Sequence, residues 1–322
     1  MGGSGARVDA HPEIAAVIRE HMRRTTCCLS GLFVLYAIGT LAQTNAGFNV
    51  SDNWAQLPPD TPQWGPLASV TVDNKDSVIV IRRTFPSVFV FGTNGQFRSA
   101  WGREGLFSGR GAHGIRVDAD GNLWATDTEY NVVYKLTMSG QILLEVGRKN
   151  VAGDNRSQDA FNRPADVAVA PNGDFFVADG YGNSRVVKFS KDGKFRKIIG
   201  GTKGTGPGQF DLVHAVVIDS KGRLLVGDRN NARIQVFDLE GKFLDQWSGL
   251  GKPYGLHITR DDTLYVGDAD GGTITIAKNG KPVDVIRDLG RPHWVGMDTK
   301  GALYMADVRG FVKKIVRVKQ TN

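Results

Sequence analysis

Short runs of β-branched and aromatic residues alternate with glycine- and asparagine-containing turns through most of the chain. One unit recurs: an apolar run that ends near a polar residue, a tight turn, and a second apolar run that usually ends in aspartate. It occupies residues 114–127, 167–179, 216–228, 256–268 and 295–307, with a weaker copy at residues 70–82. Such runs predict β-hairpins, and their regular recurrence predicts the blades of a propeller.

The copies fill residues 66–318, and no long amphipathic helix pattern follows residue 24. The predicted fold class is therefore all-β: a six-bladed β-propeller over residues 66–322, with four-stranded blades around a central channel. The last copy has only three strands. We expect the connecting segment 43–65 to donate the missing strand, around Asn53 to Leu57, because this would remove an open sheet edge.

Residues 1–42 have the pattern of an export signal. Arg23 and Arg24 precede an apolar stretch, residues 29–42, that ends in a small-residue cleavage site at Thr40 to Ala42. A spanning helix needs about 20 apolar residues, so a cleaved signal is favoured over the alternative of an uncleaved membrane anchor. Met22 is a candidate for the true start. We expect an exported protein, periplasmic or secreted, that contacts the membrane only through this segment.

Charge and cysteine content narrow the function classes. The formal net charge is +7, but lysines and arginines form no block, which argues against nucleic acid as a partner and suits an anionic, carboxylated substrate. The only cysteines are Cys27 and Cys28, within the N-terminal apolar run. The propeller therefore has neither a disulfide framework nor a thiolate metal site, and we expect it to be a monomer.

The repeat also places the histidines. The residues five positions before the turn of each copy are Ala68, His113, Asp166, His214, Tyr254 and His293. This position begins the innermost strand, so histidines of alternate blades should point at one spot on the axis from three directions. Such a trio with an open fourth position predicts a metal site, and nitrogen ligation in an exported protein favours zinc. A hydrated, metal-free channel lining is the alternative.

Two segments carry a family resemblance. Residues 180–189 and 228–237 resemble the signature of the NHL repeat, and Pro207 to Phe210 is also typical of that family. The resemblance covers nearly the whole propeller. It implies the fold but not the chemistry, because NHL propellers include both binding modules and enzymes.

The histidine trio resembles a narrower group, the lyase domain of peptidylglycine α-amidating enzymes. The matching segments are Ala112 to Ile115, Val213 to Val216, Pro292 to His293 and residues 161–169. The resemblance implies a zinc ion held by the trio and a reaction that releases glyoxylate from a peptide ending in α-hydroxyglycine, leaving the peptide amide. By motif, Tyr181 and Arg83 match the catalytic tyrosine and arginine. A turn aromatic at Tyr181, and Arg82 in place of Arg83, are the structural alternatives.

Three positions depart from that group. The resemblance implies a calcium ion on the backbone carbonyls of Val70 and Ile115 and on an aspartate after the last histidine, but Trp294 stands there. Gly182 replaces a cysteine, and Arg291 replaces a methionine. The tryptophan argues against calcium. Arg291, together with Tyr254 at the channel, is a candidate for binding a small carboxylated or peptidyl substrate.

Three functions follow in order. The first is an exported metal-dependent lyase similar to the amidating lyases. The second is a non-catalytic NHL propeller that binds a protein or glycan. The third is a lactonase-type hydrolase, which would need Glu, Asn and Asp ligands near the axis, where only Asp166 fits.

Overall fold

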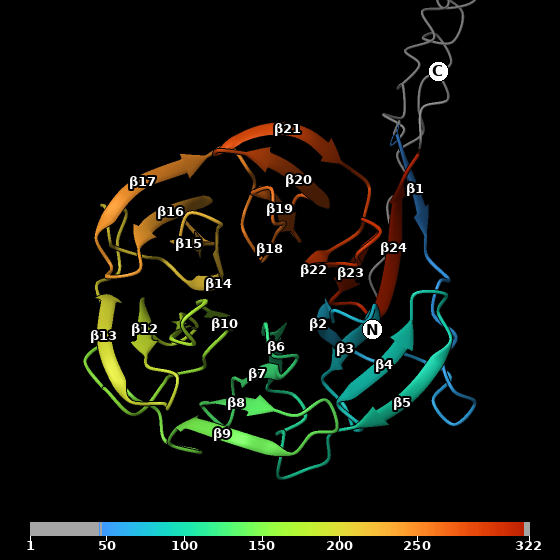
Figure 1. The fold of residues 1–322 in the computed structure, drawn as a ribbon, viewed down its shortest axis with the longest axis horizontal. Coiled ribbons are helices and arrows are strands. Elements are labelled where there is room, and N and C mark those ends of the chain that lie inside the picture. Colours follow the sequence, from blue (N-terminus) through green and yellow to red (C-terminus); the bar gives the residue numbers. More distant parts are fainter. Residues whose placement is uncertain (1–44, 46, 319–322) are drawn as a thin grey trace, which may run out of the picture. The chain divides into compact units, whose positions relative to one another are not determined.

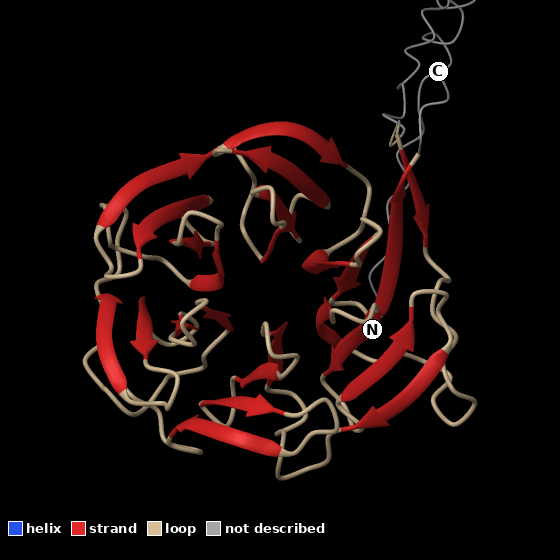
Figure 2. Cartoon of the chain, in the orientation of Figure 1, coloured by secondary structure: helices blue, strands red, loops and turns tan. Residues whose placement is uncertain are grey.

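The computed structural model describes residue 45 and residues 47–318, which contain strands, turns and loops but no helix (Figure 2). The expected export signal, residues 1–42, lies outside this part. No helix within the described part is long and apolar enough to cross a membrane.

Six antiparallel sheets of four strands form a ring around a central axis (Figure 1). From the axis outward, the first two blades contain β2 (Leu67–Val72), β3 (Ser77–Arg82), β4 (Val88–Gly92) and β5 (Phe97–Trp101), then β6 (Ala112–Val117), β7 (Leu123–Asp127), β8 (Val132–Leu136) and β9 (Ile142–Gly147). The next two contain β10 (Asp166–Val169), β11 (Phe175–Asp179), β12 (Arg185–Phe189) and β13 (Phe195–Gly200), then β14 (Val213–Ile218), β15 (Arg223–Asp228), β16 (Arg233–Asp238) and β17 (Phe243–Ser248). The last two contain β18 (Gly255–Ile258), β19 (Thr263–Asp268), β20 (Thr273–Lys278) and β21 (Lys281–Ile286), then β22 (Pro292–Met297), β23 (Leu303–Asp307), β24 (Phe311–Arg317) and β1 (Phe48–Ser51). The predicted six-bladed propeller is confirmed.

The ring closes by pairing the two ends of the chain. Strand β1 lies antiparallel to β24, with Phe48 opposite Arg317 and Ser51 opposite Lys314. The closing strand is therefore Phe48–Ser51, a few residues before the stretch around Asn53 to Leu57 that we expected. That stretch is needed elsewhere, because the ring of Trp54 packs edge-on against Tyr304 at 4.9 Å between centroids.

Aspartates close the turns that the sequence repeat marks. The Oδ1 atom of Asp118 accepts hydrogen bonds from the backbone N–H groups of Asp120 and Asn122, at 3.0 and 2.8 Å. Asp219 and Asp298 accept the equivalent pairs of bonds. A carboxylate that satisfies two backbone donors fixes a short hairpin, which explains the regular aspartate between the first two strands of these blades.

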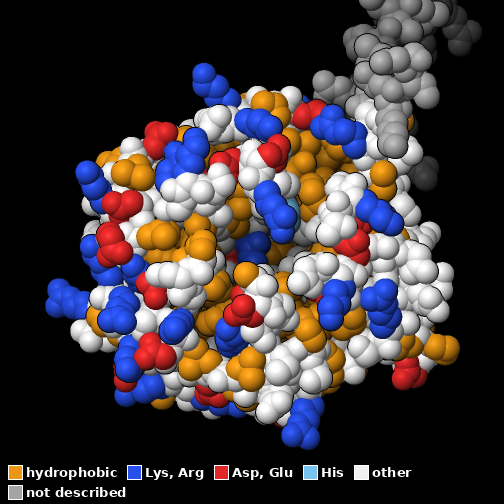
Figure 3. All heavy atoms as spheres, in the orientation of Figure 1, with side chains coloured by type: hydrophobic (Ala, Val, Ile, Leu, Met, Phe, Trp, Pro, Cys, Tyr) orange, Lys and Arg blue, Asp and Glu red, His pale blue; other side chains and the backbone are white. Residues whose placement is uncertain are grey.

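The core lies between neighbouring blades. Ile79 and Ile81 of the first blade, for example, pack with Leu123 and Ala125 of the second, and all four are buried. Each sheet therefore buries apolar side chains on both faces. On the surface drawn in Figure 3, side chains of both charges are interspersed around a central hollow.

Candidate metal centre and its mouth

Local bulges aim the three histidines at the axis. Val213 pairs with Asp228 and Ala215 with Gly227, so His214 between them is an extra residue in β14. The same irregularity occurs at His293 in β22, and β6 is irregular at His113. A bulge re-aims a side chain that a regular strand would direct elsewhere. Three inner strands thus present a histidine at the same point.

The histidines form a compact triangle. Their ring centroids are 5.0, 5.1 and 5.0 Å apart, and one ligand atom from each lies within 4.8 Å of the others. His113, His214 and His293 are at most 3% exposed. Three imidazole nitrogens that converge this closely suit a tetrahedral metal ion with one open position.

Each histidine is held by the following blade. The Nδ1 atoms of His113, His214 and His293 lie 2.8, 2.5 and 2.5 Å from the backbone oxygens of Ala165, Tyr254 and Ala68. A carbonyl oxygen only accepts, so each Nδ1 carries the proton and each Nε2 keeps a lone pair. A fixed tautomer of this kind is the usual outer support of a metal-binding histidine.

The surroundings favour neutral imidazoles. Burial lowers the pKa of His113 and His214 well below the ordinary value, and positive charge from neighbouring histidines and arginines lowers it further. Burial, with the charges of Arg83, Arg229 and Arg291, lowers the pKa of His293 to about 3. Neutral imidazole is the form that binds metal ions.

Tyr181 reaches the histidines from the loop after β11. Its hydroxyl lies 3.0 Å from Nε2 of His113 and 2.8 Å from Nε2 of His214. Two glycines allow this approach. A Cβ atom on Gly180 would lie 2.0 Å from the carbonyl oxygen of Val213, and one on Gly182 would lie 2.1 Å from the amide of Asn162. The tyrosine is therefore wedged between two neighbouring segments of backbone, and its place in the turn is not that of a surface aromatic.

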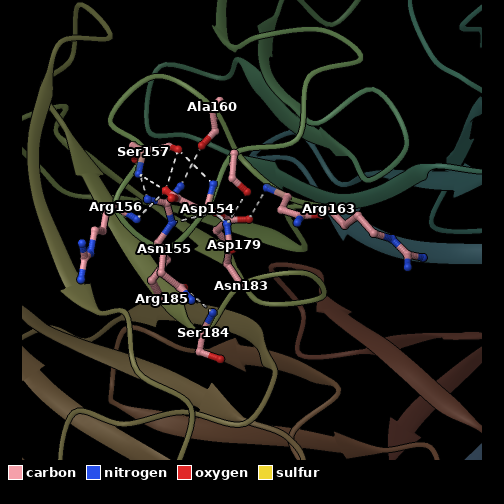
Figure 4. A network of polar contacts seen from close by, with 12 residues as sticks. Asp154, Asn155, Arg156, Ser157, Ala160, Arg163, Asp179, Asn183, Ser184 and Arg185 are labelled. Atoms are coloured by element: carbon pink, nitrogen blue, oxygen red, sulfur yellow. Dashed lines mark hydrogen bonds and ion pairs between the residues drawn. The ribbon is translucent and has the colours of Figure 1, made fainter.

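A buried ion pair supports this turn (Figure 4). Arg185 donates from Nε to Asp179 at 2.8 Å and from Nη2 to the carbonyl oxygen of Ala160 at 2.7 Å. Asp179 in turn accepts a bond from the backbone N–H of Asn162. These contacts fix the long loop between β9 and β10 against the residues that precede Tyr181.

Arginines surround the mouth of the site. Arg83 follows β3, and its Nε atom is buried without a hydrogen-bond partner among the described residues. Arg82 is engaged structurally, because it donates to the carbonyl oxygen of Trp64 at 2.6 Å and its guanidinium lies over the ring of Phe89. Of the two alternatives, Arg83 is thus the one whose charge acts on His113 and His293.

Sequence reasoning missed Arg229. Its guanidinium lies over the ring of Tyr254 at 4.5 Å and near that of Tyr181 at 5.6 Å. It directly follows the last residue of β15, just as Arg83 directly follows the last residue of β3. The repeat, applied to these loops as it was to the inner strands, would have found it. The described residues supply no ion-pair partner for Arg83 or Arg229.

Tyr254 and Arg291 also lie at this mouth. The hydroxyl of Tyr254 donates to Asp270 at 2.9 Å, and burial together with this bond raises the pKa of the phenol. Asp270 also pairs with Lys252 at 2.8 Å and, more distantly, with Arg291 at 3.5 Å. The side chain of Arg291 is 49% exposed. It is therefore available to a ligand that enters the mouth.

The residues at the expected calcium position do not fit that ion. Val70 and Ile115 lie on the inner strands β2 and β6, but the third position holds the fully buried indole of Trp294. Calcium requires oxygen ligands. Asp166, the other axial acid, forms an ion pair with Arg116 at 2.6 Å, so it is also not free to serve as a lactonase-type ligand.

The opposite end of the channel is a separate hollow. It has a volume of about 260 Å³ and is lined by residues of several inner strands, including Arg116 and His257. Burial lowers the pKa of His257 to about 4. His257 thus lies apart from the histidine trio.

Comparison with known proteins agrees with the fold. The NHL repeat model matches residues 161–189 and 210–237. The chain is 40% identical over 177 residues to peptidyl-glycine alpha-amidating monooxygenase A of Xenopus laevis, covering 53% of this chain and 18% of that protein. It is 38% identical over 128 residues to a probable peptidyl-alpha-hydroxyglycine alpha-amidating lyase of Caenorhabditis elegans, covering 39% of this chain and 36% of that protein.

A further relative is named only for its repeats and not for an enzymatic activity. The human NHL repeat-containing protein 3 is 29% identical over 282 residues, covering 78% of this chain and 79% of that protein. Among solved structures, a streptogramin B lyase superposes with a TM-score of 0.60 at 14% identity, covering 86% of this chain and all of that one. At that identity the superposition supports the fold alone. The chain spans less than a quarter of the length of the first Xenopus laevis relative.

Proposed function

From the resemblance of this NHL-repeat propeller to the amidating lyases, we propose that the chain is an exported, metal-dependent lyase acting on α-hydroxyglycine compounds. The observation that carries the proposal is the position of the Tyr181 hydroxyl, 3.0 and 2.8 Å from the Nε2 atoms of His113 and His214 that would bind the metal, which places the phenol beside the proposed metal position. The phenol and the metal ligands share one mouth of the channel with arginines. A binding module does not require that convergence.

The histidine trio fits a zinc ion. His113, His214 and His293 would hold it through their Nε2 atoms, because their Nδ1 atoms are already committed to backbone carbonyls. A bound zinc ion would supply a Lewis acid that polarises the hydroxyl of the substrate.

The reaction requires one proton to move. The carbon–nitrogen bond of the carbinolamide breaks, the carbinol carbon becomes the aldehyde of glyoxylate, and the nitrogen leaves as the amide. Tyr181 relays this proton: its oxygen accepts the hydroxyl proton of the substrate as its own proton passes to the departing nitrogen. Arg83 and Arg229 orient the substrate carboxylate, for which an arginine offers a forked pair of donors.

The direct test is glyoxylate release. The purified protein, loaded with zinc, should release glyoxylate from a peptide that ends in α-hydroxyglycine. Tyr181→Phe should lower kcat/KM about 100-fold, a typical value for loss of a general acid–base, with no change in metal content. Tyr265→Phe is the matched control, because Tyr265 packs near His257 and away from the trio.

Metal content is measured in parallel. Elemental analysis should find about one zinc per chain, and His214→Ala should abolish it. If the zinc-loaded protein releases no glyoxylate from any α-hydroxyglycine compound, the lyase assignment is wrong. The second candidate, a non-catalytic NHL propeller, is favoured by the extent of the similarity to NHL repeat-containing protein 3, and it then becomes the better description.

A further inference from the structure

The floor of the metal centre is a single indole. Trp294 directly follows His293, and its ring centroid lies 5.8, 6.1 and 5.9 Å from those of His113, His214 and His293. Nearly equal distances to three side chains arranged around the axis place the indole on that axis. Trp294 is 0% exposed. The channel is therefore closed immediately behind the histidines.

A cation lies against this indole. The guanidinium carbon of Arg116 is 5.0 Å from the ring centroid of Trp294, within the range of a cation–π contact. Arg116 donates to both oxygens of Asp166, at 3.0 and 2.6 Å, and to the carbonyl oxygen of Leu256 at 2.7 Å. Asp166 accepts a further bond from the backbone N–H of Val216 at 2.9 Å. The guanidinium is thus held from several directions.

These contacts join five of the six inner strands. Arg116 belongs to β6, Asp166 to β10, Val216 to β14, Leu256 to β18 and Trp294 to β22. Strands β6, β14 and β22 are also the three that carry the histidines. The guanidinium therefore connects the three strands that carry the histidines, on the same side of the trio as Trp294.

We propose that Arg116 is a built-in axial cation, which makes this propeller independent of calcium and keeps the three histidine-bearing strands in register. The resemblance to the amidating lyases implies calcium bound by a carboxylate at the position of Trp294. Here that position offers no oxygen, and the adjacent guanidinium repels a divalent ion. One positive charge, fully paired with Asp166, supplies the cross-strand attraction instead.

Thermal unfolding with and without calcium tests whether the propeller is independent of calcium. The midpoint Tm of the wild-type protein, at fixed zinc, should not change when millimolar calcium chloride is added. The double variant Arg116→Met, Trp294→Asp leaves two carboxylates, Asp166 and the introduced one, near the axis without a cation, so it should be less stable than the wild type until calcium is added. Its Tm should rise with calcium concentration, because a ligand that binds only the folded state stabilises it. A wild-type Tm that rises with calcium, or one tightly bound calcium per wild-type chain, overturns the proposal.

Zinc affinity tests whether Arg116 keeps the three histidine-bearing strands in register. Arg116→Met alone would leave Asp166 buried and unpaired and endanger folding, so the variant is Arg116→Met, Asp166→Asn. Its affinity for zinc, measured by competition with a chromophoric chelator, should fall about tenfold, as losses of outer support at metal sites do. Neither measurement depends on lyase activity, so this inference and the proposed reaction fail independently.

The matched control is Arg223→Met, Asp219→Asn. This pair, at 2.7 Å, lies at the turn between β14 and β15. The control should keep the wild-type zinc affinity. If the axial variant also keeps it, Arg116 does not hold the ligand strands and the proposal is wrong.

Discussion

At the scale of single residues, the position of Tyr181 depends on the absence of a side chain at each of its two neighbours, Gly180 and Gly182. Neither Gly180 nor Gly182 has a positive backbone φ angle, so neither glycine is required for a left-handed conformation. Both are instead in close contact with other segments, Gly180 with Val213 and Gly182 with Asn162. Val213 directly precedes His214, so the tyrosine turn is packed against the strand that carries one histidine of the trio.

Gly180→Ala should therefore misplace the phenol. The added methyl cannot share space with the Val213 carbonyl, and a displacement of about 1 Å at a reacting group can cost about 100-fold in rate. We expect kcat for glyoxylate release to fall by that order while zinc content is unchanged. Gly206→Ala, which meets only the flexible end of Gln209, should have wild-type kcat. Equal activity of the two variants would contradict this account.

The histidine trio also predicts how stability depends on pH in the metal-free protein. The folded-state pKa of His293 is about 3, below the ordinary value of about 6.5, so the unfolded chain binds more protons between these values. Stability is therefore complete above about pH 6.5 and declines as the pH falls toward 3. His113 and His214 act in the same direction.

Urea unfolding of the metal-free protein measures this effect. The free energy of unfolding should fall by up to about 1.4 kcal/mol per pH unit for each histidine below pH 6. His293→Gln should reduce this dependence on pH by the contribution of about one proton. The free energy of unfolding could instead depend on pH equally in the wild type and in His293→Gln between pH 6 and 4.5. Burial of the His293 imidazole would then not lower stability at acidic pH.

Arg291 provides a prediction about substrate binding. Its half-exposed guanidinium makes only a long contact with Asp270, at 3.5 Å. We expect Arg291→Met to raise KM for a carboxylated substrate several-fold and to leave kcat nearly unchanged. This is the result of losing a contact that stabilises the bound substrate and the transition state equally. Arg317→Met is a suitable control, since Arg317 on the outer part of the last blade is also well exposed and makes a similar contact, with Asp284 at 3.3 Å. A change in kcat without a change in KM would place Arg291 in the chemical step.

At the scale of elements, the sequence predicts the inner strands well and the details of their ends poorly. The repeat phase identified His113, His214 and His293 because equivalent positions share one radius and height. It could not show the bulges at these histidines, because the strand pattern contains the same residues with or without one. Arg229 was overlooked because it lies in a loop, where no periodicity of apolar residues draws attention to it.

The closing strand shows a different limit. The segments Phe48–Ser51 and Asn53–Leu57 are both short, and each contains aromatic or apolar residues suited to an edge. The choice is made by tertiary packing: Phe48 and Val50 pack onto the last blade, whereas Trp54 fits between Phe91 and Tyr304. Contacts between distant parts of the chain cannot be read from local pattern.

Removal of β1 should weaken the whole ring. A chain that begins at Asp52 loses the burial of Phe48 and Val50 and leaves β24 with an unpaired edge. Partial burial of two such side chains is worth about 2–3 kcal/mol, so Tm should fall by roughly 5–10 °C. Scanning calorimetry, with a chain that begins at Asn45 as control, measures this. An unchanged Tm would mean that β1 is dispensable for closure.

At the scale of the whole molecule, the candidate site residues gather at one end of the channel. The sequence gives a basic chain with scattered charges, and Figure 3 shows both signs mixed over the surface drawn. Folding nevertheless brings Arg83 and Arg229, distant in sequence and free of ion-pair partners in the described part, to the same mouth. Composition could suggest an anionic substrate, but only the ring of blades creates a local excess of positive charge.

The bonds from histidine Nδ1 to backbone have a kinetic consequence. Each one joins a ligand strand to the next blade, and the bond from His293 to Ala68 crosses the seam where the last blade meets the first. Loss of a metal ion bound by the trio requires the histidine rings to turn away from it, and these bonds to the neighbouring blades resist that movement. The exchange rate of cobalt, whose visible absorption changes on release, would then report how often these bonds open in solution.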